Sequence, residues 1–367
     1  MNWKTPFFGT ALEFAAHRDA IMSRVEAVYA SGQVLMGSDV QQLEQQVGTA
    51  CDRRHAIAVG SCTDALYFAL AAAGIGPGDE VLVPDFTFVA SASCILRAGA
   101  KPVFVDIAQD ANMDLSKAEA AITTKTRAMI YVHLYGLMGD AGAVETFAAK
   151  HGLILIEDAA QAIGARRANR KAGSMGLISC LSFDPTKPIG APGSGGMAMT
   201  DDADLAATLR RLRYHGRNER REFVSLGYNS QMPSATAAVL RYKMRFAEAW
   251  EDRRRAVAAL YKQGLADSDC LLPPEPSDAR HIYHKFVIRH PRRKELQEAL
   301  ASHGVQAMVH YPSPLHCHAL FADCVKSVES PLADAFAGSV LSLPCHPFLA
   351  DAEVENITTI ILETLKS

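Results

Sequence analysis

Short β-branched runs alternate with helix-like segments through the first two-thirds of the chain, and this alternation constrains the fold more than any other feature. The runs predict strands at Ala56–Val59, Glu80–Val83, Pro102–Asp106, Ala128–Val132, Leu153–Glu157, Ile178–Phe183 and Gly196–Thr200. The helical segments expected between or after them are Thr63–Ala73, Val89–Ala98, Ala141–Lys150 and Ala203–Tyr214. Strands that alternate with helices are typical of a mostly parallel sheet covered by helices on both faces, so the expected class is α/β.

The last third of the chain has a different pattern. From Ser234 to about Ala266 it predicts one long charged helix, whose Arg253-Arg254-Arg255 run we interpret as a solvated face. The remainder predicts a strand and two helices, at His284–Arg289, Arg292–His303 and Asp351–Lys366. We therefore expect a large domain over residues 1–240 and a smaller α+β domain over residues 241–367.

Composition excludes several classes of protein. Apolar residues make up 49% and charged residues 21%, which is a globular composition with enough core-forming side chains. The net charge of -3 gives no electrostatic reason to expect nucleic acid or an anionic membrane as a partner. No signal peptide and no apolar stretch of ~20 residues is evident. The eight cysteines form no CxxC pair, so we expect free thiols and a cytoplasmic protein.

Small and polar residues follow several predicted strands, at the sheet edge where α/β proteins bind ligands. Gly60-Ser61-Cys62-Thr63 leaves one strand and opens a helix, so backbone N–H groups and the helix dipole can hold a phosphate there. The alternative is a capped helix start, with Ser61 or Thr63 as the cap. Phe86 or Phe88, after the next strand, can stack on a planar ring, although an aromatic residue at such a position is more often part of the core.

The run Leu181–Lys187 and the pair Glu157-Asp158 predict the chemistry of pyridoxal phosphate (PLP). That cofactor requires a lysine for its Schiff base and a carboxylate that keeps the pyridine nitrogen protonated. Lys187 lies between Thr186 and Pro188, so the backbone there is extended or turning. Asp158 ends a strand and can equally be a helix cap.

Together these motifs resemble the DegT/DnrJ/EryC1/StrS family of PLP-dependent sugar aminotransferases, and the resemblance runs nearly end to end. The strings that carry it are VLMG (34–37), GSCTDAL (60–66), DFTFVASA (85–92), AKPVFVD (100–106), HLYG (133–136), EDAAQA (157–162), SFDPTK (182–187), GYNSQM (227–232), HYPSPLH (310–316) and LSLP (341–344). The resemblance implies the aspartate aminotransferase fold of type I, with a mixed seven-stranded sheet in the large domain.

The resemblance also implies roles for individual residues. Lys187 is expected to form the Schiff base and to carry the proton, and Asp158 to pair with the pyridine nitrogen. The other expected cofactor contacts are Gln161 at the phenolic oxygen, Phe88 on the ring, and Cys62, Thr63 and Ser182 at the phosphate. Family members are homodimers with shared sites, so Asn229 is expected to contact the phosphate of the other subunit. His310, Tyr311 and His316 are expected on the substrate side.

Some positions depart from the family's pattern. Pro188, Ser194 and Asp184 replace residues usual near the substrate, and Cys62 replaces a glycine of the phosphate loop. A related branch replaces the lysine with His and acts as a dehydratase, so Lys187 favours amino transfer. No metal is expected, because the histidines at 310, 316, 318 and 346 lie among prolines without an HExxH frame.

The expected reaction is a ping-pong transfer of an amino group from L-glutamate or L-glutamine to a keto-sugar that is linked to a nucleotide. One alternative is an aminotransferase acting on a cyclitol of the keto-inositol type. The other alternative, from a different class, is a PLP-binding regulator without catalysis, which the set of Lys187, Asp158 and Ser182 disfavours.

Overall fold

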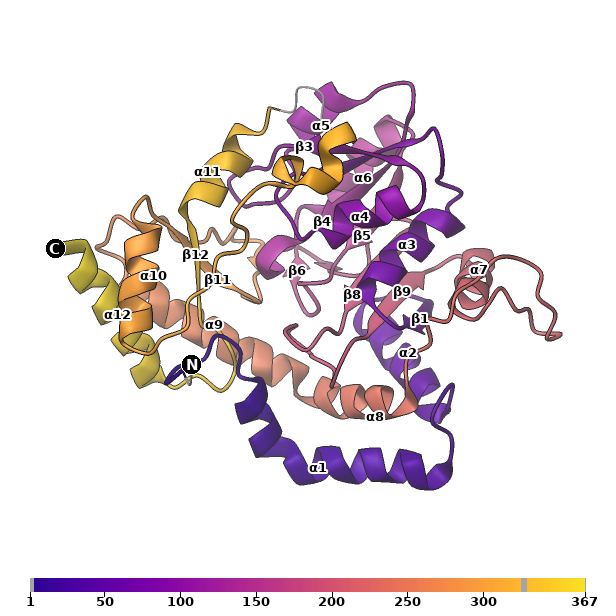
Figure 1. Ribbon diagram of the computed structural model, residues 1–367, viewed down its shortest axis with the longest axis horizontal. Coiled ribbons are helices and arrows are strands. Elements are labelled where there is room, and N and C mark those ends of the chain that lie inside the picture. The colour runs from indigo at the N-terminus through magenta and orange to yellow at the C-terminus, as the bar shows by residue number, and fades with distance from the viewer. Residues whose placement is uncertain (1–2, 325–328, 367) are drawn as a thin grey trace.

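The computed structural model of the protein describes residues 3–324 and 329–366. Its centre is a seven-stranded sheet whose strands lie in the order β1-β9-β8-β5-β4-β2-β3 (Figure 1). These strands are β1 (His55–Val59), β2 (Glu80–Pro84), β3 (Lys101–Val105), β4 (Thr126–Val132), β5 (Ile154–Asp158), β8 (Ile178–Ser182) and β9 (Gly196–Thr200). Each of the seven strands predicted from the sequence is confirmed, with bounds that differ by at most two residues.

The sheet is mixed because one strand is reversed. β9 is antiparallel to both of its neighbours, β1 and β8, whereas the pairs from β8 through β5, β4 and β2 to β3 are parallel. All strands other than β9 therefore end at the same edge of the sheet. The predicted phosphate loop after β1, Asp158 at the end of β5 and Ser182 at the end of β8 meet at that edge.

Helices cover both faces of the sheet because successive strand residues point to opposite sides. In β1, Ile57 and Val59 face one apolar cluster, and Ala56 and Ala58 face the other. The first cluster includes side chains of α3 (Cys62–Ala72), α4 (Ala90–Arg97) and α7 (Ala203–Arg213). The second includes those of α2 (Ser38–Ala50), α5 (Leu115–Ala121), α6 (Ala141–Lys150) and α8 (Ser234–Lys243).

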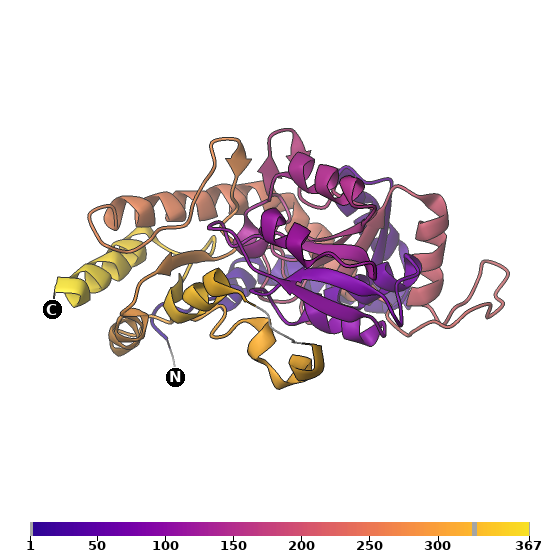
Figure 2. The same cartoon turned by 90° about the horizontal axis from the view of Figure 1, so that it is seen from above.

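A third apolar cluster joins elements from the last third of the chain. It is built by α9 (Ala247–Gly264), β11 (Phe286–Arg289), α10 (Arg293–Ser302), β12 (Val340–Leu343) and α12 (Asp351–Lys366). β11 and β12 pair antiparallel, and Figures 1 and 2 both place α10 and α12 at the end of the molecule away from the large sheet. This arrangement suits a separate small domain, but the boundary at residues 240 and 241 stays a prediction.

The prediction of one continuous helix from Ser234 to Ala266 is wrong. The segment forms α8 and α9, and a 3-10 turn, η2 (Met244–Phe246), separates them. Tertiary contacts hold this turn: Lys243 Nζ donates a 2.6 Å hydrogen bond to the Gly190 carbonyl, and the Phe246 ring stacks on Trp250 with 5.7 Å between centroids. A pattern of charges along the sequence does not show such contacts.

Local sequence signals start and stop the remaining elements. Asp114, Asp140 and Asp202 accept backbone N–H hydrogen bonds as caps of α5, α6 and α7, and left-handed Gly32 ends α1 (Thr10–Ser31). The other elements are η1 (Leu134–Gly136), β6 (Arg166–Arg167), β7 (Arg170–Lys171), β10 (Ala279–Arg280), η3 (Leu315–Cys317), η4 (Ala319–Cys324) and α11 (Pro331–Ser339). Among the described residues, no helix has the length and apolar character that crossing a membrane requires.

Candidate active site

A cavity of about 360 Å³ opens at the edge of the sheet where the parallel strands end. Nine of the residues predicted from the sequence line it: Cys62, Thr63, Phe88, Asp158, Gln161, Ser182, Lys187, His310 and Tyr311. They come from segments far apart in the chain, so the fold has brought them together. Asn229 and His316 do not line this cavity.

One end of the cavity has the form of an anion cradle. Ser61 caps α3 by accepting the Asp64 N–H at 3.1 Å, so the first N–H groups of the helix, at Cys62 and Thr63, remain available. This result confirms the capping alternative for Ser61 and leaves the cradle intact beside it. Ser182, at the end of β8, faces the same space.

Gly196 allows the two walls of this cradle to approach each other. A Cβ atom at position 196 would lie 2.4 Å from the Ser61 carbonyl carbon and 2.5 Å from the Cys62 nitrogen. Those neighbours are backbone atoms, which cannot swing away. Only glycine therefore lets β9 pass beside the turn from β1 into α3.

The buried carboxylate of Asp158 accepts two hydrogen bonds. Ser91 Oγ donates to Oδ2 at 2.7 Å, and the Ala160 N–H donates to Oδ1 at 3.1 Å. Burial raises the pKa of Asp158, while these hydrogen bonds and the charge of Lys187 act in the opposite direction. A cationic pyridinium beside this carboxyl group would favour its ionised form, which is the fit expected for PLP.

A tight turn presents Lys187 to the cavity. Asp184 Oδ1 accepts the Thr186 N–H at 3.0 Å and the Thr186 hydroxyl at 2.6 Å, and the Lys187 N–H donates to the Asp184 carbonyl at 2.9 Å. Burial lowers the pKa of Lys187, with Asp158 and Asp184 opposing that shift. The amine is therefore biased toward its neutral, nucleophilic form.

Gln161 is fixed at both ends of its amide. Its Oε1 accepts the Tyr135 N–H at 3.0 Å, and its Nε2 donates to the Tyr311 hydroxyl at 3.3 Å. The ring of Phe88 lies 6.2 Å from that of Tyr311 and is 51% exposed, so a planar ligand can cover it. Phe86, the alternative stacking residue, is 1% exposed and belongs to the core.

His310 and Tyr311 form another wall. His310 Nδ1 lies 3.0 Å from Ser342 Oγ, and burial lowers the pKa of His310 to about 2, so the imidazole is neutral. Burial raises the pKa of Tyr311, whose hydroxyl therefore keeps its proton. Both groups can act as neutral hydrogen-bonding partners of a polar substrate.

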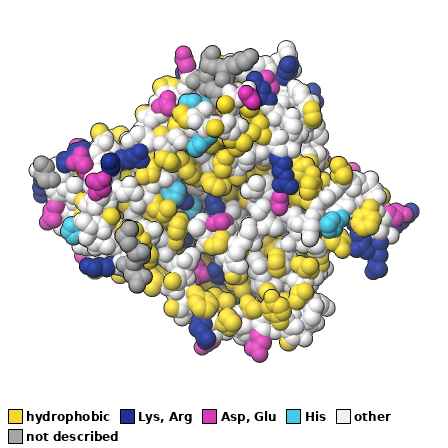
Figure 3. Space-filling view, in the orientation of Figure 1, with side chains coloured by type: hydrophobic (Ala, Val, Ile, Leu, Met, Phe, Trp, Pro, Cys, Tyr) yellow, Lys and Arg dark blue, Asp and Glu magenta, His cyan; other side chains and the backbone are white. Residues whose placement is uncertain are grey.

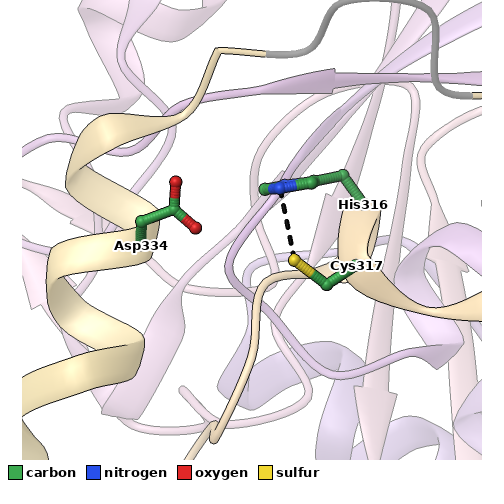
Figure 4. A group of neighbouring side chains, drawn as sticks. All are labelled: His316, Cys317 and Asp334. Carbon is green, nitrogen blue, oxygen red and sulfur yellow. Dashed lines mark hydrogen bonds between the residues drawn. The ribbon is translucent and has the colours of Figure 1, made fainter.

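His316 lies elsewhere, in a small group with Cys317 and Asp334 (Figure 4). Its Nδ1 is 2.5 Å from the buried carboxylate of Asp85, and its Nε2 is 3.3 Å from Cys317 Sγ. Both ring nitrogens are therefore occupied away from the cavity, and the position does not support the predicted substrate contact. For the same reason we assign no metal to this group.

Sequence reasoning missed several polar residues of the cavity wall, among them Ser91 and Lys285. Ser91 holds Asp158, which is 67 positions away in the sequence, and no local pattern indicates that contact. Lys285 could have been found from the sequence. It lies within the predicted strand His284–Arg289, and a lysine is seldom buried in a strand unless it binds a partner or a ligand.

The geometry can be compared with known proteins. The sequence profile of the DegT/DnrJ/EryC1/StrS aminotransferase family matches residues 16–362. The chain belongs to this family. The family depends on PLP, and its members are aminotransferases. The residues that line the cavity fit this cofactor, because an anion cradle, a buried carboxylate and a buried lysine face one space.

Individual members are similar over almost the whole chain. A UDP-N-acetyl-3-dehydro-alpha-D-glucosamine 3-aminotransferase of Acidithiobacillus ferrooxidans is 40% identical and covers 99% of both chains. A protein of Geobacillus stearothermophilus named as a pleiotropic regulatory protein is 40% identical over 98% of both. The crystal structure of DesV from S. venezuelae, in complex with a ketimine intermediate, superposes with a TM-score of 0.96 at 36% identity over 99% of both chains.

Proposed function

We propose that this protein transfers an amino group from L-glutamate or L-glutamine to a keto-sugar that is linked to a nucleotide, by a ping-pong mechanism. The observation that carries the proposal is the single cavity in which Lys187, Asp158 and the anion cradle meet. The Acidithiobacillus relative, whose name specifies a UDP-linked substrate, supports the nucleotide sugar as the class of acceptor.

The chain's own residues perform distinct tasks in this proposal. Cys62 and Thr63, through the start of α3, and the Ser182 hydroxyl hold the cofactor's phosphate. Asp158 would hold the pyridine nitrogen in its protonated form, Gln161 would bind at the phenolic oxygen, and Phe88 would cover the ring. When bound, PLP supplies the electron sink that makes the α-carbon of the donor acidic.

Lys187 then moves the proton. Its Nζ, biased toward the neutral form by burial, would accept the proton from the donor's α-carbon and hold it for transfer within the site. In the second half of the cycle the same atom moves a proton in the reverse sense toward the carbon of the acceptor that receives the amino group. His310 and Tyr311 line the space left for that acceptor.

We further propose a homodimer in which Asn229 contacts the phosphate bound by the other subunit. Asn229 is exposed and lies in residues 214–230, a segment that projects beyond α7 (Figures 1 and 2). On this segment Phe223 is 73% and Leu226 86% exposed, so the chain itself does not cover them. Figure 3 shows further hydrophobic side chains gathered over α1, and a second copy of the chain would bury such surface.

The cytoplasm remains the proposed compartment. All eight cysteines are free and six of them are buried, which suits a reducing environment.

Product analysis tests the proposal against its alternatives. The holoenzyme is incubated with L-glutamate or L-glutamine and with either a UDP-linked 3-keto-sugar or a keto-inositol, and the products are identified by mass spectrometry. We expect the amino product only from the nucleotide sugar. An amino-cyclitol product would establish the first alternative, and a protein that binds PLP but transfers nothing from either donor would establish the regulator.

A further inference from the structure

A second lysine lies in the wall of the cavity, and the proposed reaction does not yet use it. Lys285 directly precedes β11, and only 4% of its surface is exposed. Its Nζ lies 2.7 Å from His284 Nε2, within hydrogen-bond distance. Within the part of the chain that the structure describes, no carboxylate forms an ion pair with Lys285.

The surroundings of Lys285 are positive. Burial, followed by the charges of Lys187 and Arg254, lowers the pKa of Lys285 well below its usual value. The charge of Asp184 raises this pKa, but its effect is smaller than the others. After burial, the charge of Lys285 is in turn the largest effect that lowers the pKa of His310. A buried amine without an anion beside it favours its neutral form, so a carboxylate bound next to Nζ would favour the charged form and complete a pair.

The cofactor does not supply that anion, because its phosphate has a separate cradle at Cys62, Thr63 and Ser182. The donor does supply one. For Lys187 Nζ to accept the α-proton, the donor's α-carbon must lie next to it, and the α-carboxylate is bonded to that carbon. Lys285 is close enough to Lys187 for their charges to interact and faces the same space.

We propose that Lys285 Nζ binds a carboxylate of the substrate, and that this carboxylate is the α-carboxylate of the amino-acid donor. The inference rests on the proposed function and names the donor subsite of the same cavity. His284, whose Nδ1 has no hydrogen-bond partner among the described residues, positions Nζ through its Nε2. A carboxylate on the keto-sugar is the other source of the same chemistry, and the experiment separates the two.

Binding without turnover is the direct test. The PLP-loaded wild type and Lys285→Met are titrated calorimetrically with the α-methyl analogue of the donor that the wild type uses, which has no α-proton to lose. A second titration uses the donor lacking only its α-carboxylate, 4-aminobutyrate for glutamate or 4-aminobutanamide for glutamine. We expect Lys285→Met to bind the α-methyl analogue about 10- to 100-fold more weakly, as for loss of a charged hydrogen bond. The affinity for the decarboxylated amine should not change.

Matched variants guard the result. Lys285→Arg keeps the charge and should recover part of the lost affinity. Lys294→Met, at a surface lysine whose side chain is 86% exposed, should behave as the wild type. The cofactor's visible absorption shows whether each variant is loaded, and Lys285→Gln replaces the Met variant if that variant is not.

Two outcomes would overturn the inference. A loaded Lys285→Met that binds the α-methyl analogue with unchanged affinity would remove the lysine from the donor subsite. A variant in which only the KM of the keto-sugar rises would place the carboxylate on the acceptor. A wild type that transfers no amino group would instead refute the proposed function, whatever the affinity of the Lys285 variants.

Discussion

Burial acts on Asp158 and Lys187 in the same chemical sense, because it favours the neutral form of each. It raises the pKa of the carboxyl group and lowers the pKa of the amine. The neutral amine is the form that the proposed proton transfer needs. The carboxyl group, in contrast, becomes a stable anion only when a cation lies beside it. The ionised form of Asp158 therefore lowers the stability of the folded chain until the cofactor is bound.

Replacing Asp158 with Asn should therefore separate stability from activity. We expect Asp158→Asn to lower kcat by roughly 10²- to 10³-fold, as for loss of a directed electrostatic interaction in an active site. The cofactor-free variant should melt at a higher temperature than the cofactor-free wild type at pH 7, because a buried charge has been removed.

The pH dependence of this difference has a definite sign. Because the folded-state pKa of Asp158 is raised above its ordinary 3.8, the folded chain binds more protons than the unfolded chain between those two values. The stability of the cofactor-free wild type therefore falls as the pH rises through the folded pKa, and the advantage of Asp158→Asn disappears below the unfolded pKa. Calorimetric melting of both proteins across this pH range measures the difference in stability. A stability advantage of Asp158→Asn that grows at low pH would contradict the account.

At the scale of the elements, the site depends on how closely β9 passes the turn between β1 and α3. We expect Gly196→Ala to cost about 1–3 kcal/mol of stability and to weaken cofactor binding, because its Cβ meets the backbone of Ser61 and Cys62. Urea unfolding and a cofactor titration measure the two effects.

Gly338→Ala is the matched control for this substitution. Gly338 lies in α11, and outside its own helix no described residue has an atom within 4 Å of a Cβ placed there, so alanine should be neutral or stabilise by about 0.5–1 kcal/mol. If the two variants unfold alike, the close approach at Gly196 is not the constraint that we describe.

The sheet could be predicted from the sequence because its strands are β-branched runs buried on both faces, as in β4, and because polar residues end them. The sequence could not show which of the two phenylalanines faces the cavity, since only packing places Phe86 in the core and Phe88 in the cavity. The same holds for the turn at Met244–Phe246 and for the contact of Ser91 with Asp158. Each of these depends on a partner that lies far away in the sequence.

At the scale of the whole molecule, the position of Asn229 makes a prediction about assembly. If each site takes Asn229 from the other subunit, Lys187→Ala and Asn229→Asp fall in the same site of a mixed dimer and leave its other site intact. After unfolding and refolding an equal mixture of the two inactive variants, about a quarter of wild-type activity should return, as expected for random pairing in a two-fold dimer.

The same experiment has a clear negative outcome. Each variant refolded alone serves as the control and should stay inactive. If the mixture also stays inactive although light scattering shows dimers, Asn229 acts within its own subunit. A monomer at working concentration would refute the shared site directly.

The most direct test of the central claim is the half-reaction of the purified holoenzyme, followed by its visible absorption and by the keto acid released. With L-glutamate or L-glutamine and no acceptor, we predict that one donor bleaches the cofactor's visible band and yields about one keto acid per site. In Lys187→Ala the rate of this conversion should fall by about 10²- to 10⁴-fold. A loaded wild type that responds to neither donor, or a Lys187→Ala variant that converts at the full rate, would contradict the account.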